Sequence, residues 1–515
     1  MNFTSFHFLL FFAVTIVLGH VLKNRKQRVF LLLASYYFYG VFEPWYLILI
    51  LGSTALDYMA GLGIEARRLQ AQGTEPTGFV RRLTVLPERT WLVLSLVMNL
   101  ALLGYFKYTN FGIEILNDLQ PYGDTVFAWP AAHILLPIGI SFYTFQSMSY
   151  TIDVYRGVLK PRRDITDFAL YVAFFPQLVA GPIVRATTFL SQLDDRLPIT
   201  KHDIMVGTTR IVVGFFRKLV LADNMGIFVN AVFGNPGAYG VVDMWVATIA
   251  FGFQIYLDFA GYTDIARGVA RLFGFEFDIN FLYPMASGNI TEHWSRWHIS
   301  LTTWLRDYVY IPLGGSKVGP VRLYGNIFTI WLLTGIWHGP AYHFVAWGVW
   351  QFVMVVTHRQ YKMTRAWAWL NEKGGILYAI LSRVLMIFFL NFGFIWFRAE
   401  TMFKATFMQG RLFGIVDLNA WLGLKSSSAA THAGFMAPQD AAAFVTHGLP
   451  GWLHGEFAFL LGILFAYEYL MNYLQLEYFW KPENRWKLIT MLIVMIFCII
   501  VFASPATPNF MYFQF

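Results

Sequence analysis

The chain of 515 residues is 57% hydrophobic and only 13% charged, with a mean hydropathy of +0.51. Soluble domains carry roughly 25% charged residues, so this chain has about half the charge that a water-exposed surface requires. The composition therefore excludes a soluble protein and predicts an all-α, polytopic integral membrane protein with a single membrane domain over residues 1–515. The formal net charge of +8 is typical of basic cytoplasmic loops rather than of nucleic-acid binding. The single cysteine, Cys498, excludes an internal disulfide framework.

Apolar segments long enough for membrane helices recur along the whole chain, and a spanning helix needs about 20 largely apolar residues. The first segment lacks a basic leader and a small-residue cleavage site, so we expect it to be a retained helix and not a signal peptide. One further segment, Phe168–Ile183, is interrupted by Pro176, Gly181 and Pro182, which predicts a re-entrant segment. Because some segments are short, we predict about 11 transmembrane helices. The segments are Phe3–Leu22, Val29–Phe42, Trp45–Ile64, Trp91–Tyr108, His133–Val154, Ile204–Val232, Val241–Tyr262, Gly325–His338, Ala341–Tyr361, Ile376–Trp396, Phe457–Leu474 and Leu488–Ala503.

Basic clusters between these segments predict the orientation. Placing all of them in the cytoplasm satisfies the positive-inside rule and leaves both termini outside the cytoplasm. Counting the membrane crossings from these clusters places the nearly uncharged segment 421–456 on the extracytoplasmic face as a loop. The clusters are Lys23–Arg28, Arg67–Arg89, Arg156–Arg163, Arg359–Arg365 and Lys481–Lys487.

Two carboxylates, Asp258 and Asp264, fall near the end of the segment Val241–Tyr262. A carboxylate at membrane depth is costly, so it usually faces a cavity or a charged partner. Pairing with Arg267 or Arg271, or capping of a neighbouring helix, would account for both aspartates equally well.

The segment His293–Tyr308 predicts an interfacial amphipathic helix. At 100° per residue it places an aromatic and apolar face opposite Arg296, Thr303 and Asp307, and His298 falls at the edge of the aromatic face. The arginines suit anionic lipid or the phosphates of an acyl donor. Taken alone, a histidine at this place is more often a hydrogen-bonded core residue than a catalyst. The aromatic and apolar face consists of Trp294, Trp297, Leu301, Trp304, Leu305 and Tyr308.

His338 ends another predicted helix, because Gly339 and Pro340 should break that helix directly after it. Counted from Gly325, the helix is about 21 Å long, against a hydrocarbon core of about 30 Å, so we expect it to end inside the membrane. An imidazole there can act as a general base, since its ordinary pKa of about 6.5 lies near working pH. The alternative is a histidine that bonds the carbonyls freed at the break.

Metal binding is not predicted. The pairs His293/His298 and His338/His343 are each five residues apart, so their members diverge by about 140° around a helix. Helical metal sites use spacings such as i, i+4, and no cysteine is available to complete either pair.

The sequence Trp337-His338-Gly339 within a membrane helix resembles the membrane-bound O-acyltransferase (MBOAT) family, and within it the bacterial branch that acetylates polysaccharides such as alginate. Four further segments carry the resemblance, which covers nearly the whole chain; they are Leu31–Tyr39, Pro137–Gln146, Phe174–Ile183 and Phe510–Phe515. The resemblance implies helices around a central tunnel, with His338 catalytic and His298 lining the same tunnel. It also implies acetyl-CoA as donor substrate with no tightly bound cofactor. The implied partners are membrane lipids, an extracytoplasmic transferase protein and a cell-envelope polysaccharide, with no nucleic acid.

The predicted catalytic residues are therefore His338 and His298. Candidate substrate-binding residues, for which packing or interfacial anchoring is an equal alternative, are Trp337, Arg296, Trp304, Arg306, Asp307 and Asp258. The expected location is the bacterial cytoplasmic (inner) membrane. Three other functions stay open: D-alanyl transfer from a carrier-protein thioester to teichoic acid, a transporter or flippase, and an inactive scaffold for envelope assembly.

Overall fold

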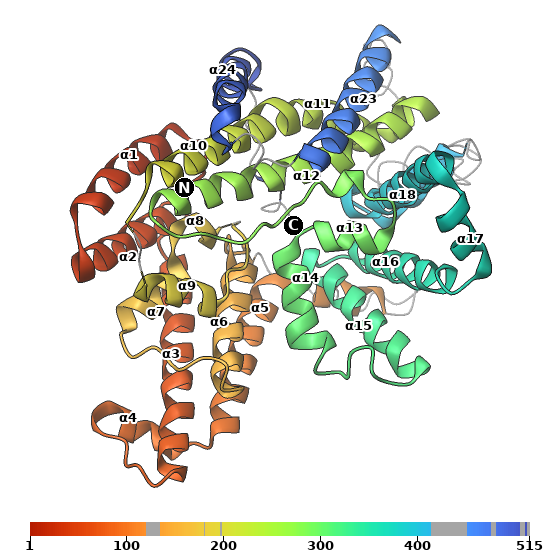
Figure 1. Ribbon diagram of the computed structural model, residues 1–515. Helices are drawn as coiled ribbons and strands as arrows, with labels where there is room; N and C mark the ends of the chain where they lie inside the picture. The colour runs from red at the N-terminus through yellow and green to blue at the C-terminus, as the bar shows by residue number, and fades with distance from the viewer. Residues whose placement is uncertain are drawn as a thin grey trace. The chain divides into compact units, whose positions relative to one another are not determined.

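The computed structural model describes residues 1–119, 134–179, 181–195, 198–413, 451–474, 480–504 and 510–511 (Figure 1). The secondary structure of these residues is helical, with turns and short connections and no strand. The described residues fall into two compact units. Unit 1 comprises residues 1–215 and 262–278, and unit 2 comprises residues 216–261 and 279–511. The all-α prediction is confirmed for the described residues.

Unit 1 is built around three long helices that pack against one another, α3, α5 and α6. Asp57 of α3 is completely buried and accepts hydrogen bonds from Asn99 of α5 at 3.0 Å and from Thr151 of α6 at 3.1 Å. A buried carboxylate requires such donors, so this cluster joins the three helices. The helices of unit 1 are α1 (Phe6–Val21), α2 (Asn24–Gly40), α3 (Tyr46–Ala71), α4 (Gly78–Arg82), η1 (Leu83–Val85), α5 (Glu88–Asp118), α6 (Ile140–Tyr155), α7 (Ile165–Ala173), α8 (Phe175–Leu178), α9 (Ala186–Asp194) and α10 (Lys201–Phe215).

The predicted interruption of the segment Phe168–Ile183 is confirmed. Helix α7 ends at Ala173, Phe174 leaves helical geometry, and Pro176 lies in the first turn of α8. Proline is tolerated there because the first turn needs no amide hydrogen from it.

Unit 2 contains the helices that carry both predicted catalytic histidines. They begin with η2 (Phe216–Ala222), a π-helical turn, and α12 belongs to unit 2 only as far as Gly261. The others are α11 (Asp223–Gly234), η3 (Pro236–Ala238), α12 (Val241–Leu272), η4 (Pro284–Ala286), α13 (Ile290–Arg296), α14 (Ile299–Leu305), η5 (Arg306–Tyr310), α15 (Pro320–His338), α16 (Tyr342–Tyr361), α17 (Arg365–Lys373), α18 (Gly375–Arg398), α19 (Met402–Leu412), α23 (Gly451–Leu474), η7 (Pro482–Asn484) and α24 (Arg485–Phe502).

Helices α15 and α16 lie side by side and cross where two glycines meet (Figure 1). A Cβ atom on Gly335 would lie only 2.5 Å from the carbonyl oxygen of Phe344, and one on Gly348 only 2.5 Å from that of Trp331. Small residues at such a crossing allow two membrane helices to approach closely. This contact places the C-terminal end of α15 against α16.

Five of the described helices are long and apolar enough to cross a membrane: α3, α5, α12, α18 and α24. Each of the five overlaps a predicted segment, and together they make the protein a multi-pass membrane protein. The total of about 11 spans stays a prediction. Among the shorter helices, α1 has 16 residues.

Several predicted boundaries were wrong. Helices α5 and α12 each extend ten residues beyond their predicted ends at Tyr108 and Tyr262. Two further differences concern α15 and α23. Helix α15 begins at Pro320 and has 19 residues, so it is about 28 Å long and close to the hydrocarbon thickness of about 30 Å. Its length therefore gives no reason to place His338 deep in the membrane. Helix α23 begins at Gly451, six residues before the predicted start at Phe457, and it includes the end of the predicted loop 421–456. Residues 421–450 of that loop lie outside the described residues.

Candidate active site

The predicted single helix over His293–Tyr308 is wrong, because the chain breaks at His298. Trp297 is extended, and His298 has φ 43° and ψ 52°, in the left-handed region. That conformation costs a non-glycine residue roughly 1–2 kcal/mol, so neighbouring contacts must hold it. Asn280 provides them: its main-chain oxygen accepts from Ile299 N at 2.9 Å, and its side-chain Oδ1 accepts from Ser300 N at 3.1 Å.

The break turns the His298 side chain into the interior, where only 1% of its surface is exposed. Its Nδ1 lies 3.2 Å from Asn280 Oδ1. The ring of Phe259 meets the imidazole edge-on, with centroids 4.8 Å apart, and Trp337 lies 6.0 Å away. The imidazole is thus held in one orientation by a polar contact and by aromatic packing.

His338 is the last residue of α15, and the predicted end of the helix at this position is confirmed. Its ring packs among three aromatic side chains: Trp337 at 4.9 Å, Trp347 at 5.1 Å and Phe397 at 5.0 Å between centroids. Trp337 contacts the rings of both His338 and His298, so the predicted site tryptophan lies next to both histidines.

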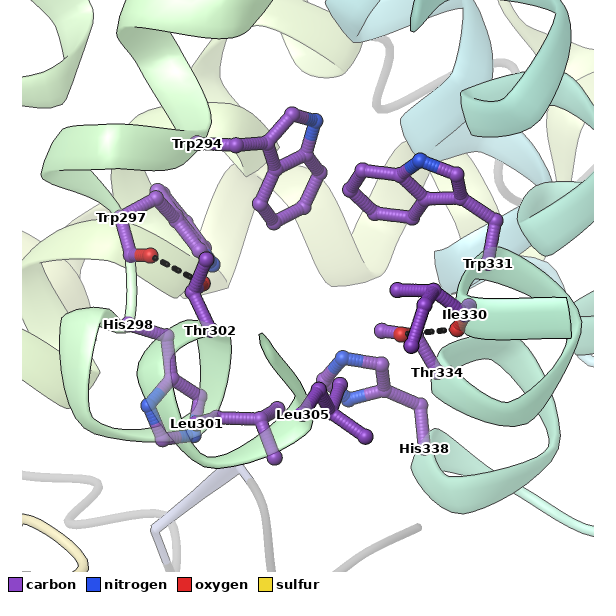
Figure 2. A pocket seen from close by; sticks show the side chains of 10 residues that line it. All are labelled: Trp294, Trp297, His298, Leu301, Thr302, Leu305, Ile330, Trp331, Thr334 and His338. Atoms are coloured by element: carbon purple, nitrogen blue, oxygen red, sulfur yellow. Dashed lines mark hydrogen bonds between the residues drawn. The ribbon is translucent and has the colours of Figure 1, made fainter. Parts of the chain in front are cut away.

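His298 and His338 line one small cavity with a volume of about 50 Å³. Figure 2 shows the two histidines entering from opposite sides of the view, with the indoles of Trp294 and Trp331 next to each other above them. The centroids of these two indole rings are 4.7 Å apart, so the rings are in contact. The hydroxyl of Thr334 donates to the carbonyl of Ile330 at 2.6 Å. The lining residues are Trp294, Trp297, His298, Leu301, Thr302, Leu305, Ile330, Trp331, Thr334 and His338.

A second cavity of about 710 Å³ adjoins the first, since Trp294, Thr302, Ile330 and Trp331 line both. This volume is within the range of small-molecule sites, about 300–1,000 Å³. The remaining lining residues include the cations Arg306, Arg359 and Lys362; the full set beyond the shared four is Thr291, Ser295, Arg306, Tyr310, Ile327, Val355, His358, Arg359, Lys362 and Met363.

Arg306 begins the π-helical turn η5 at the wall of the larger cavity. Asp307 accepts a hydrogen bond from Arg306 Nε at 2.7 Å, and this contact raises the pKa of the Arg306 guanidinium. Arg306 therefore keeps its charge, and its remaining donors can meet an anionic group.

The other predicted substrate-binding residues do not line either cavity. Arg296 pairs with Glu292 at 2.7 Å and also bonds the side chain of Asn472. Trp304 is buried and packs on Tyr308 with centroids 5.1 Å apart. Both contacts agree with the packing alternative, and Asp307 acts on the cavity through Arg306.

Asp258 lies in a buried ion pair with Lys218 at 2.6 Å and accepts a hydrogen bond from Met511 N at 2.8 Å. Lys218 also pairs with Asp223 at 2.7 Å. The arginines suggested as partners are therefore wrong for Asp258, because Lys218, 40 positions earlier in the chain, supplies the charge. For Asp264 the suggestion is confirmed, since Arg267 lies 3.9 Å from its carboxylate.

Sequence reasoning missed Asn280 and the position of Arg359 and Lys362 at the larger cavity. Asn280 lies in a short connection with no motif, so no sequence signal marked it. Arg359 and Lys362 were noticed only as markers of orientation, although a basic cluster near a predicted catalytic helix is a usable signal. Within the described ranges, no three histidine, cysteine, aspartate or glutamate side chains gather closely enough to hold a metal ion.

Comparison with known proteins gives a family match and relatives that point to the same family. Residues 158–427 match the sequence model of the membrane-bound O-acyltransferase family, MBOAT. The chain is 37% identical over 421 residues to a probable alginate O-acetylase AlgI of Pseudomonas putida, covering 81% of each protein. It is 32% identical over 420 residues to a peptidoglycan O-acetyltransferase of Helicobacter pylori, covering 76% of this chain and 74% of that protein.

A more distant relative is a teichoic acid D-alanyltransferase of Bacillus subtilis, 29% identical over 281 residues, which are 52% of this chain and 69% of that protein. The relatives named here all carry the name of an acyl-transferring enzyme, and the family match covers both His298 and His338. This chain is an acyltransferase and belongs to the membrane-bound O-acyltransferase family.

Proposed function

We propose that this protein transfers an acetyl group from cytoplasmic acetyl-CoA towards hydroxyl groups of a cell-envelope polysaccharide. The observation that supports this most directly is the pair of adjoining cavities. The inner cavity is lined by His298 and His338, and the outer one by Arg306, Arg359 and Lys362. The similarity to an alginate O-acetylase and a peptidoglycan O-acetyltransferase supports a polymer hydroxyl as the acceptor.

The outer cavity suits the donor. Coenzyme A carries phosphates, and arginine and lysine are the residues that bind phosphate most readily. The aromatic walls Trp294 and Trp331, shared with the inner cavity, provide an apolar passage for the thioester arm.

The inner cavity suits a small acyl group. A cavity needs about 10–15 Å³ to hold one water molecule, so a cavity of about 50 Å³ holds only a few heavy atoms. An acetyl group fits this space, whereas a long fatty acyl chain does not.

In the proposed reaction, His338 takes the proton of the attacking hydroxyl as that oxygen bonds to the thioester carbonyl carbon. The carbon–sulfur bond then breaks, the ester forms, and the thiolate of coenzyme A receives the proton from His338. His298 lies across the same cavity and is the partner of His338 in this reaction. The burial of both imidazoles excludes bulk water that would hydrolyse the thioester.

The proposed setting is the bacterial inner membrane, with about 11 spans around a tunnel and both termini extracytoplasmic. The donor would then enter from the cytoplasm, where the basic cluster Arg359–Arg365 is expected. A soluble partner protein outside the cytoplasm completes delivery to the polysaccharide in this proposal.

The experiment uses purified protein in nanodiscs with acetyl-labelled coenzyme A, following thiol release and label transfer to a soluble carbohydrate acceptor. His338→Gln should abolish turnover, whereas His202→Gln is the control, because His202 is an exposed residue of α10 and lines neither cavity. Both variants must show the thermal unfolding of the parent protein. Equal turnover by His338→Gln and the parent would remove His338 from the reaction.

The similarity to a teichoic acid D-alanyltransferase supports D-alanyl transfer as the second candidate. The same assay with a D-alanyl thioester on a carrier protein distinguishes the two. Turnover of that donor but not of acetyl-CoA would overturn the acetyl proposal. Vesicle uptake of substrate without any acyl donor would instead identify a transporter.

A further inference from the structure

Asn280 makes contacts that determine which way its side-chain amide faces. Its Oδ1 lies 3.1 Å from the main-chain nitrogen of Ser300 and 2.9 Å from the Ser300 hydroxyl. A main-chain N–H can only donate, so the Asn280 atom facing it must be the oxygen and cannot be the amide nitrogen. The main-chain oxygen of Asn280 also accepts from Ile299 N at 2.9 Å, which holds the two segments in register.

The same oxygen lies 3.2 Å from Nδ1 of His298. An amide oxygen has no hydrogen to offer, so a hydrogen bond between the two requires a proton on Nδ1 of the imidazole. A neutral imidazole with its proton on Nδ1 has its lone pair on Nε2. The Ser300 hydroxyl also lies 3.5 Å from Nδ1, but its single hydrogen is donated to Asn280 Oδ1 at 2.9 Å, so it too can only accept from Nδ1. The tautomer thus follows from the two groups that face Nδ1.

We infer that Asn280 is a positioning residue that holds His298 as the Nδ1-protonated tautomer, so that Nε2 enters the reaction only as a hydrogen-bond or proton acceptor. This inference rests on the proposed function of the cavity that His298 lines. In this role, neutral His298 accepts a hydrogen bond at Nε2 from a hydroxyl or thiol group and so orients that group. It does not donate to the developing oxyanion.

The local structure around His298 also fixes the orientation of its imidazole. His298 has a left-handed backbone, which ordinarily disfavours a histidine, and its ring is bounded by Phe259 at 4.8 Å and Phe281 at 6.2 Å between centroids. A 180° flip of the imidazole about its Cβ–Cγ bond would exchange Nδ1 for Cδ2. A carbon would then face Asn280 Oδ1, and the hydrogen bond would be lost. Strain held at a site by surrounding contacts is typical of functional positions.

The test combines kinetics with a direct measurement of the tautomer. Asn280→Asp keeps an acceptor oxygen in place, so kcat should stay within several-fold of the parent value. Asn280→Leu removes the acceptor at similar size, and kcat should fall about 10- to 1,000-fold at an unchanged KM for the donor, because tautomer control of a catalytic histidine has effects of this order. Asn326→Leu, which removes a buried amide of α15 that bonds Leu313 and Gly315, controls for a general loss of packing.

The tautomer itself is read from ¹⁵N-histidine-labelled protein in nanodiscs by solid-state NMR, with His298→Gln assigning the signal. A protonated Nδ1 and a bare Nε2 are expected in the parent and in Asn326→Leu, and their loss is expected in Asn280→Leu. If Asn280→Leu does not fold, the parent spectrum and the Asn280→Asp kinetics still decide the matter. A protonated Nε2 in the parent, or a collapse of kcat in a folded Asn280→Asp, would overturn the inference.

Failure of the proposed function is distinguishable, because it appears as no thioester turnover by the parent protein. The NMR measurement needs no turnover and tests the tautomer in either case. Turnover by the parent with equal kcat in folded Asn280→Leu would overturn the inference alone.

Discussion

The crossing of α15 and α16 offers a sharp test of how the fold positions His338. Gly335→Ala adds one methyl group where a Cβ would meet the carbonyl oxygen of Phe344 at 2.5 Å and Cα of Gly348 at 3.1 Å. Both obstacles are main-chain atoms, so no side chain can rotate away to relieve the contact. Because non-bonded heavy atoms are comfortable at about 3.5 Å, the two helices must separate by roughly 1 Å.

The expected cost has two parts. Overfilling a packed contact costs about 1–3 kcal/mol of stability. His338 follows Gly335 by three residues, less than one helical turn, so the displacement reaches its imidazole. A shift of about 1 Å at a reacting group costs on the order of 100-fold in rate, so acetyl-CoA turnover should fall by about that factor.

Gly325→Ala is the matched control, because nothing lies within 4 Å of the position its Cβ would take in the same helix. There the substitution should stabilise the helix by about 0.5–1 kcal/mol and leave turnover unchanged. Thermal unfolding in detergent and thioester turnover are measured for both variants. Equal unfolding midpoints and equal turnover would show that the crossing does not position His338 and would refute this reasoning.

Three further perturbations follow from the described contacts. Lys218→Met should destabilise the protein by about 3–5 kcal/mol because it leaves the buried Asp258 carboxylate without its cation, and adding Asp258→Asn should recover part of that loss in thermal unfolding. Arg359→Gln removes a positive charge from the larger cavity, so it should raise KM for acetyl-CoA several-fold with kcat unchanged. The rise should be largest at low salt, because dissolved ions screen an exposed charge. The Arg162 hydrogen bond holds the pKa of Asp194 below its ordinary value, so this pair stabilises the fold above about pH 4, and the stabilisation is lost as pH falls through the lowered pKa.

Each of these has a control. Lys201→Met removes an exposed lysine and should leave the unfolding midpoint unchanged. Arg365→Gln, outside both cavities, should leave KM unchanged, and an equal rise in KM would contradict a specific role for Arg359. For Asp194, whose side chain is half exposed, the effect is small, under about 1 kcal/mol, and an Asp194→Asn variant with the same acid unfolding profile as the parent would contradict it.

Much of the architecture follows from local sequence. Scarcity of charge and recurrent apolar segments require helices in a membrane, since only hydrogen-bonded helices or closed barrels satisfy the backbone there. Gly339 and Pro340 end α15 at His338 because proline cannot continue the helix, and Pro176 likewise marks the start of α8. These features depend on a few consecutive residues, so they could be read directly from the chain.

The arrangement of the site depended on tertiary contacts. Periodicity predicted one helix through His298, but hydrogen bonds from Ile299 and Ser300 to Asn280 break it and turn the imidazole towards the cavity shared with His338. Lys218 became the partner of Asp258 in the same way, across 40 residues of sequence. Helical periodicity describes neighbours within one segment, whereas a buried polar group takes whichever partner the packed chain brings within hydrogen-bonding distance. The sequence alone therefore indicated the class of the protein and predicted both histidines as site residues. The tertiary structure decided how those histidines are held and which residues contact them.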